Sequence, residues 1–192
     1  MHVRFIIFSL LFTGMYKQLN AQEHSETSNI KFTSINQVGL LTGSAGQSAS
    51  IQTINGITKD KWFAGIGTGI DYYGTRSVPV FVDVRRTLGN SLKSPFLYAD
   101  GGINFPWISD GQKMTRGYTA TSSAGVYLEG GAGLKFRMKS NNAFLLSAGF
   151  SYKEVKDKTE LMTIWIWPTP DKTYETYKYH YRRIVVKLAL EL

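Results

Sequence analysis

The sequence contains no cysteine among its 192 residues. Disulfide bonds and thiolate metal sites are therefore excluded, and stability has to come from closure of a sheet or from a buried core. The sequence also lacks any uninterrupted run of about 20 apolar residues, so it predicts no transmembrane helix. A membrane-embedded form would have to be a closed β-barrel, because lipid offers no hydrogen-bond partner to an open backbone edge.

The N-terminus has the pattern of a secretory signal. His2 and Arg4 precede a short apolar run from Phe5 to Phe12, and a small residue, Ala21, precedes the polar Gln22. This pattern predicts export with cleavage after Ala21. We expect three segments: a signal peptide over 1–21, a flexible lead-in over 22–31 and one β-barrel domain over 32–192.

The chain is basic, with a formal net charge of +8. Its lysines and arginines are scattered over predicted loops and strand ends. A nucleic-acid interface would need a concentrated basic patch with aromatic platforms. Together with export, this excludes nucleic acid as an expected partner.

Short alternating segments dominate the rest of the chain, and the last one is the clearest. Apolar residues occupy every even position from Ile184 to Leu192, while polar residues are frequent at the odd positions. A period of two indicates a strand with one apolar and one polar face. Eight strands are predicted, over residues 32–43, 47–56, 61–73, 77–88, 95–106, 122–138, 143–155 and 177–192. Turns are predicted between them, including Gly43–Gly46, Asn55-Gly56 and 139–142.

Two predicted connections are long, 107–121 and 156–176. In membrane barrels the periplasmic turns are short and the extracellular loops are longer. With eight strands both termini lie in the periplasm, and the two long connections fall on the extracellular side. The pattern therefore predicts an all-β, eight-stranded antiparallel up-and-down transmembrane barrel.

Alternation leaves open which face is inside, because a soluble lipocalin-like carrier has the same pattern with its apolar face inward. Aromatic residues on the apolar face favour lipid outside, since they cluster at the strand ends like the girdles of membrane barrels. These residues are Trp62, Tyr72, Phe105, Trp107, Phe136, Phe144 and Tyr152. The first two strands break strict alternation at Ile35, Val38, Leu40, Leu41, Ile51 and Ile54, and their faces stay unassigned.

The chain resembles the small eight-stranded outer-membrane β-barrel proteins of Gram-negative bacteria. The resemblance rests on the signal ending Leu19-Asn20-Ala21-Gln22, the segment Trp62–Asp71 and the strand Arg183–Leu192, and it covers nearly the whole mature chain. It implies an integral, monomeric outer-membrane protein that contacts lipid and, during biogenesis, the barrel-insertion machinery. Members of this family include anchors, adhesion proteins and a few lipid-modifying enzymes.

Charged residues on the polar face are the strongest candidates for functional residues. An eight-stranded barrel is just wide enough for side chains to fill it, so opposite charges inside would pair and plug the lumen. The predicted network consists of Asp71, Asp83, Arg85, Asp100, Glu129, Lys135, Arg137, Lys153, Arg183, Lys187 and Glu191. Acids and bases are nearly balanced, which indicates neutralisation rather than a single-sign ion filter.

No catalytic motif is present. Outside the signal only His24 and His180 remain, and neither a phosphate-binding loop nor metal-ligand spacing occurs. We therefore predict no cofactor, no metal and no catalytic residue. The alternative is a lipid-modifying enzyme that uses His180 with a partner among Ser122, Ser123, Ser151 and Glu154.

The predicted loop 156–176 is the better candidate for contact with a partner. It is rich in aromatic residues with prolines that limit loop entropy, as binding surfaces are. The candidate contact residues are Trp165, Trp167, Tyr174 and Tyr177, and the expected partner is an extracellular protein or glycan. The competing interpretation is that 159–167 only extend the last hairpin beyond the membrane.

Overall fold

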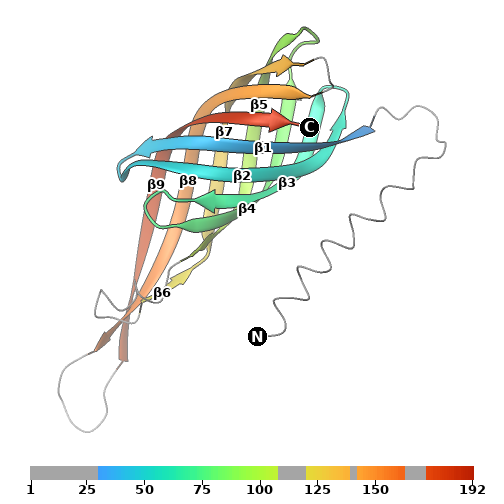
Figure 1. The fold of residues 1–192 in the computed structure, drawn as a ribbon. Coiled ribbons are helices and arrows are strands. Elements are labelled where there is room, and N and C mark those ends of the chain that lie inside the picture. Colours follow the sequence, from blue (N-terminus) through green and yellow to red (C-terminus); the bar gives the residue numbers. More distant parts are fainter. Residues whose placement is uncertain (1–29, 108–119, 139–141, 163–171) are drawn as a thin grey trace, which may run out of the picture.

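The computed structural model describes residues 30–107, 120–138, 142–162 and 172–192, and these form an all-β structure (Figure 1). The predicted signal peptide and residues 22–29 of the lead-in lie outside the described residues. No helix in the described part is long and apolar enough to cross a membrane. The strands are β1 (Ile30–Gly43), β2 (Gly46–Lys59), β3 (Trp62–Asp71), β4 (Ser77–Thr87), β5 (Lys93–Pro106), β6 (Ala120–Ser123), β7 (Gly125–Arg137), β8 (Ala143–Met162) and β9 (Lys172–Glu191).

The sheet closes on itself. Each strand from β1 to β5 pairs antiparallel with the next, β5 pairs with β7, and β7, β8 and β9 follow in order. Closure comes from β1 and β9, which pair from Ile35–Glu191 to Gly43–Arg183. β6 and β7 both pair with β8 and form one crossing interrupted at Ala124. The predicted fold class, an eight-stranded antiparallel barrel, is confirmed.

Short turns join the consecutive strands from β1 to β4. β1 and β2 are joined at Gly43–Gly46, as predicted, and Gly46 has a φ of 96°, which glycine adopts without strain. The predicted turn at Asn55-Gly56 is wrong, because both residues lie inside β2. The chain turns instead at Asp60 and Lys61, between the paired residues Lys59 and Trp62.

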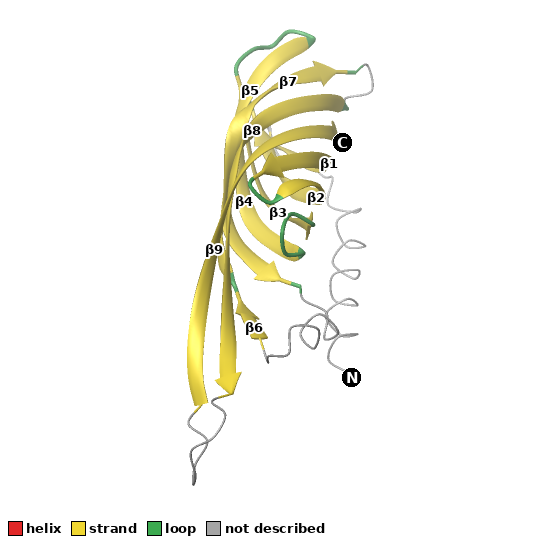
Figure 2. Cartoon of the chain, turned by 90° about the vertical axis from the view of Figure 1, so that its left-hand side faces the viewer, coloured by secondary structure: helices red, strands yellow, loops and turns green. Residues whose placement is uncertain are grey.

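The prediction of a long loop over 156–176 is also wrong for most of its length, and the competing interpretation, an extended last hairpin, is confirmed for residues 159–162. β8 and β9 continue as a paired hairpin to Met162 and Lys172, far past the turns at the same end of β1–β4 (Figures 1 and 2). We name the part of this hairpin from 156 to 162 and from 172 to 178 the hairpin extension. β6 pairs with its first residues, Lys156–Thr159.

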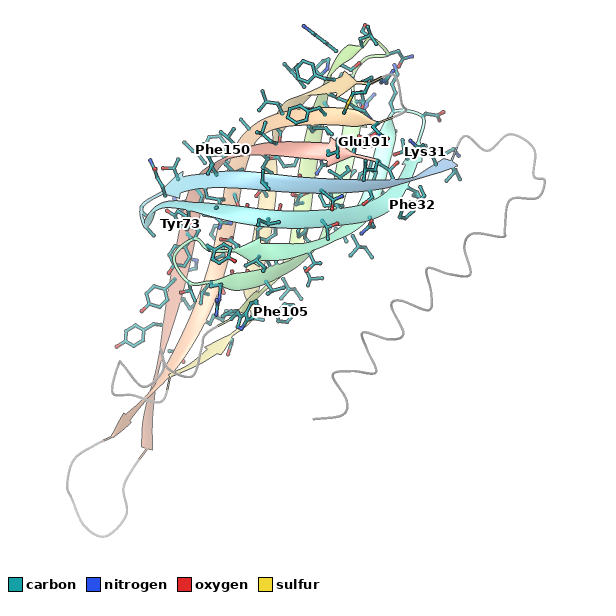
Figure 3. The ribbon with its side chains drawn as sticks, in the orientation of Figure 1. Lys31, Phe32, Tyr73, Phe105, Phe150 and Glu191 are labelled. Carbon is teal, nitrogen blue, oxygen red and sulfur yellow. The ribbon has the colours of Figure 1, made fainter. Side chains whose placement is uncertain are left out.

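The barrel has an apolar outside and a polar inside. Phe150 is 75% exposed, and the alternating residues of β4, β5, β7, β8 and β9 predicted for the lipid face are turned outward, as Phe105 and Phe150 show (Figure 3). Charged side chains such as Asp83 and Lys187 are buried within the barrel. The soluble-carrier interpretation, with an apolar interior and a polar exterior, is therefore wrong for this structure.

The structure shows why the faces of β1 and β2 could not be assigned from the sequence. Ile35, Leu41 and Ile54 are buried inside, whereas Val38 and Ile51 are exposed outside. The inner isoleucines pack with rings from other strands in a core cluster inside the barrel; the cluster is Ile35, Ile54, Phe63, Phe81, Phe96, Tyr98, Tyr127, Leu145 and Ala189. The interior is thus partly apolar, and apolar residues occur on both faces of these two strands.

Candidate functional site: the lumen

A first group of charges lies where β3 ends and turns into β4. Asp71 forms an ion pair with Arg183 of β9 and lies 3.4 Å from Lys153 of β8. Arg183 also donates to the Ser151 hydroxyl at 2.6 Å. All three charged groups are buried, so each charge is compensated by a partner rather than by water. We name Asp71, Lys153 and Arg183 the turn-side cluster.

Lys153 fastens the β3–β4 turn to the barrel wall. Its ammonium group donates to the carbonyl oxygens of Tyr73 and Thr75, both at 2.8 Å, and to the Ser77 hydroxyl at 2.9 Å. Tyr73, which belongs to this turn, has a fully buried side chain. Its hydroxyl accepts a hydrogen bond from the Ala45 amide of the β1–β2 turn at 2.8 Å. The turn is therefore folded over this end of the lumen.

A second group occupies the middle of the barrel. The Arg85 guanidinium donates to both carboxylate oxygens of Asp83, its own-strand neighbour, at 2.7–3.0 Å. It also donates to Gln37 at 3.2 Å, and Gln37 donates to Gln52 at 2.6 Å. Gln52 accepts from Lys187 at 3.2 Å, so one chain of polar contacts crosses the lumen from β4 to β9.

Lys187 is the cation that neutralises the other two carboxylates. It forms an ion pair with Glu129 and lies 3.7 Å from Asp100. Glu129 also accepts hydrogen bonds from the hydroxyls of Tyr98 at 3.2 Å and Tyr127 at 2.9 Å. Asp100 accepts no hydrogen bond within the described part, which leaves Lys187 as its main compensation. We name Asp83, Arg85, Asp100, Glu129 and Lys187 the central network.

A third pair lies at the opposite mouth. Lys135 donates to Glu191 at 2.6 Å, and both are only partly buried. Arg137 was predicted inside, but it is exposed and donates to the carbonyl of Asn90 in the β4–β5 turn at 3.0 Å. Arg137 follows Lys135 by two residues and is the last residue of β7, so its side chain lies beyond the mouth of the barrel.

Aromatic rings fill the space between the charged groups, and they were not among the site residues predicted from the sequence. Phe81 lies opposite Gly67, and a Cβ atom at Gly67 would approach the Phe81 ring to 2.5 Å. Phe96 lies opposite Gly133 in the same way, with an approach of 2.6 Å. The available signal was this pairing of an inward aromatic with an inward glycine on the next strand.

The charges inside the barrel cancel. Five buried or partly buried carboxylates (Asp71, Asp83, Asp100, Glu129 and Glu191) face five cations (Arg85, Lys135, Lys153, Arg183 and Lys187). No cluster of three or more potential metal ligands occurs among the described residues. Paired charges and aromatic rings therefore occupy the described part of the lumen.

The predicted aromatic girdles lie on the outer surface near both ends of the barrel. Trp62, Phe136 and Phe144 lie at the end that carries the β2–β3 turn, and Tyr72, Phe105, Trp107 and Tyr152 at the other. Cations cover several of these rings: Arg86 lies 5.1 Å from the Trp62 ring centre, and Arg76 lies 4.5 Å from that of Trp107. Such pairs suit a boundary between hydrocarbon and charged head groups.

His180 lies on the outer face just beyond the apolar band of β8 and β9. Its Nδ1 is 2.6 Å from the Tyr152 hydroxyl and 3.9 Å from Glu154. Of the serines considered as partners, Ser151 faces the lumen and binds Arg183, so it is turned away from His180. The geometry brings together a histidine and a carboxylate, but it does not bring Ser151 to them.

The predicted contact residues of the last loop are described only in part. Trp165 and Trp167 lie outside the described residues. The backbone of Tyr174 is part of β9, and Tyr177 is 48% exposed on the hairpin extension.

The comparisons with known proteins concern the fold alone. No protein-family model matches the chain, and none of the curated proteins matches it. Among solved structures, the chain is similar to the N-terminal β-barrel domain of Pseudomonas aeruginosa OprF, with a TM-score of 0.46 and 13% identity over 86% of this chain and 98% of that one. It is also similar to the outer membrane protein AlkL in DMPC lipid bilayers, with a TM-score of 0.45 and 10% identity over 89% and 92% of the two chains.

Proposed function

We propose that this chain is a non-enzymatic, integral outer-membrane β-barrel with a structural or surface-interaction role. The observation that carries the proposal is the contrast between its two faces: apolar side chains cover the outside, whereas the charges are paired inside. Exposing this much apolar surface to water is unfavourable for a soluble protein. Lipid as the surrounding solvent removes that cost.

The interaction role is assigned to the hairpin extension. If the short turns after β2 and β4 lie in the periplasm, the hairpin extension projects from the outer surface. Trp165, Trp167, Tyr174 and Tyr177 remain the proposed contacts for an extracellular protein or glycan. The filled, electrically neutral lumen supports the interpretation that the barrel anchors this hairpin in the membrane and does not act as a pore.

Electrophoresis with and without boiling, after separation of outer membrane from periplasm, tests the barrel. A folded membrane barrel is expected in the membrane fraction and is expected to migrate faster unboiled than boiled. A protein found in the periplasm with no such shift would contradict the proposal. Planar-bilayer recordings should show no channel steps, and steps that respond to changes at Lys187 would contradict the filled lumen.

One variant distinguishes the enzymatic alternative from the proposed non-enzymatic role. His180→Ala removes the only histidine of the proposed mature chain besides His24. We expect outer-membrane lipid composition to be the same with this variant as with the unaltered chain, by mass spectrometry of extracted lipid A. A change in lipid A acylation or head groups would instead support the lipid-modifying enzyme.

A further inference from the structure

The apolar outer surface is interrupted by polar residues on β1, β2 and β3. Five polar side chains point outward there, and cross-strand pairing joins them: Ser34 with Asn55, Asn36 with Thr53, and Thr53 with Thr68. We name these five residues the polar patch. The outward positions of β4, β5 and β7 at the same levels carry Val80, Ile103 and Val126, which are exposed and apolar.

The polar patch lies within the apolar band and not at its edge. Towards the β2–β3 turn it is bordered by the exposed pair Phe32 and Ile57, and towards the β1–β2 turn by the exposed pair Val38 and Ile51. Asn55 and Thr53 are four and six residues from Lys59, which pairs with the girdle residue Trp62. At roughly 3.4 Å per residue, that is about 14 and 20 Å along the strand.

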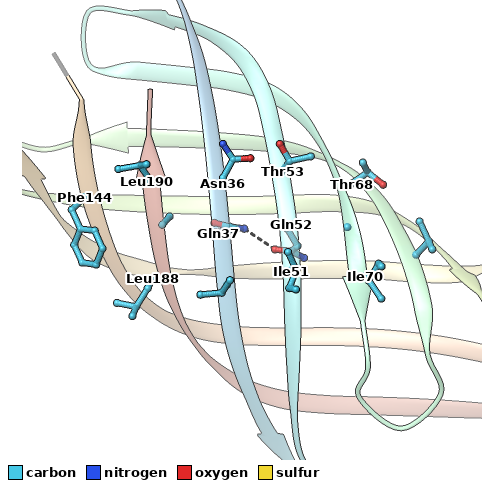
Figure 4. Close-up of a pocket in the computed structure, with 14 residues that line it drawn as sticks. Asn36, Gln37, Ile51, Gln52, Thr53, Thr68, Ile70, Phe144, Leu188 and Leu190 are labelled. Atoms are coloured by element: carbon cyan, nitrogen blue, oxygen red, sulfur yellow. Dashed lines mark hydrogen bonds between the residues drawn. The ribbon is translucent and has the colours of Figure 1, made fainter. Parts of the chain in front are cut away.

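The outer surface is also hollowed beside this patch. An open groove of about 750 Å³ runs across β9, β1, β2 and β3, and Asn36, Thr53 and Thr68 lie in a row along it (Figure 4). Apolar side chains such as Ile70 and Leu188 border the row.

Polar groups in hydrocarbon are costly unless they are hydrogen-bonded. Within the described part of the chain, no hydrogen bond joins the side chains of the polar patch. Amides and hydroxyls carry both donors and acceptors, so the patch is complementary to itself, and it carries no charge that would repel a second copy. Copies of one membrane protein share one orientation, so a two-fold axis along the membrane normal sets the patch of one against the patch of the other.

From these observations we infer that two copies of the chain pair side by side in the membrane through the β1–β3 face. In this arrangement the Asn36, Thr53 and Thr68 side chains of the two copies face one another. The inference rests on the proposed membrane location, and it replaces the monomer that the sequence resemblance implied.

Single cysteines test the pairing directly, because the chain has none of its own. Thr53→Cys and Thr68→Cys, treated with an oxidant in intact outer membranes, should give a disulfide-linked band of twice the chain mass. Leu128→Cys on the outer face of β7 is the matched control and should remain monomeric. Equal cross-linking at both faces, monomers throughout, or a conjugate with a protein of different mass would each overturn the proposed pair.

A second variant removes the polar groups and leaves the surface apolar. Asn36→Leu, Thr53→Val and Thr68→Val combined should shift the detergent-solubilised protein from the mass of two chains to that of one. Val82→Ile with Leu128→Val on the far face should leave the two-chain mass unchanged. Unboiled samples of every variant should keep their faster migration. A lost gel shift in the unaltered protein would refute the barrel itself, whereas a retained shift with a single-chain mass in the unaltered protein would refute only the pair.

Discussion

At the scale of single residues, Lys187 has the greatest consequence for stability. It is buried between Glu129 and Asp100, and Asp100 has no hydrogen bond in the described part to replace it. Removing one partner of a buried ion pair leaves a charge uncompensated and costs about 3–5 kcal/mol. We expect Lys187→Met to lower the free energy of unfolding by this amount, measured by urea titration in lipid vesicles.

The control for this change is Lys178→Met on the exposed hairpin extension, where surface substitutions stay within about 0.5 kcal/mol. Adding Glu129→Gln to Lys187→Met should recover part of the loss, because only Asp100 is then left as a carboxylate without its cation. Equal effects of Lys187→Met and Lys178→Met would contradict the central network.

Glycines that face aromatic rings make a second prediction at this scale. Gly67→Ala places a Cβ atom 2.5 Å from the Phe81 ring, and Gly101→Ala meets only Leu128 at 3.7 Å. Overpacking of a filled interior costs about 1–3 kcal/mol. The urea midpoint should therefore fall for Gly67→Ala and stay nearly constant for the outward-facing control Gly101→Ala. An unchanged midpoint for Gly67→Ala would show that the lumen has spare room.

At the scale of elements, the hairpin extension should be separable from the barrel. Replacing residues 158–176 by Asn-Gly closes β8 onto β9 at the paired residues Asp157 and Tyr177. The pairs from Ala143 to Lys156 remain, so the gel shift and the urea midpoint should be retained. Shortening the β3–β4 turn over 72–76 is the contrasting change. It removes the Tyr73 and Thr75 carbonyls that bind Lys153, and the urea midpoint should fall.

The elements differ in how far the sequence predicted them. In β4 and β9 a regular period of two predicted the strand and both faces, because their inward residues are largely polar. In β1 and β2 the period failed, because Ile35 and Ile54 pack in the apolar cluster inside the barrel while Asn36 and Asn55 face outward. The hairpin extension was foreseen only as the competing interpretation of residues 159–167. A strand outside the membrane needs no apolar face, so its sequence lacks the apolar alternation that identifies a membrane strand.

The sequence also did not predict which side chains contact one another inside the lumen. Alternation predicts that Asp100, Glu129 and Lys187 share the inner face, but which acid pairs with which base depends on the stagger of eight strands. That stagger is set by turn positions such as Asp60-Lys61, which sequence reasoning placed five residues too early at Asn55-Gly56. Gln37 and Gln52 join the network only once this register is known.

At the scale of the whole molecule, the prediction concerns its orientation in the membrane. The turns divide into two sets, one at the end with the hairpin extension and the other at the end with Glu191. If the extension projects outward, Ser44 in the β1–β2 turn is extracellular and Asn90 in the β4–β5 turn is periplasmic. With no native cysteine, Ser44→Cys and Asn90→Cys each give one labelling site. A membrane-impermeant maleimide should label intact cells at position 44 alone, and both positions after the outer membrane is permeabilised. Labelling of position 90 in intact cells would reverse the orientation and put the aromatic hairpin in the periplasm, where an extracellular partner is impossible and the search would move to periplasmic proteins.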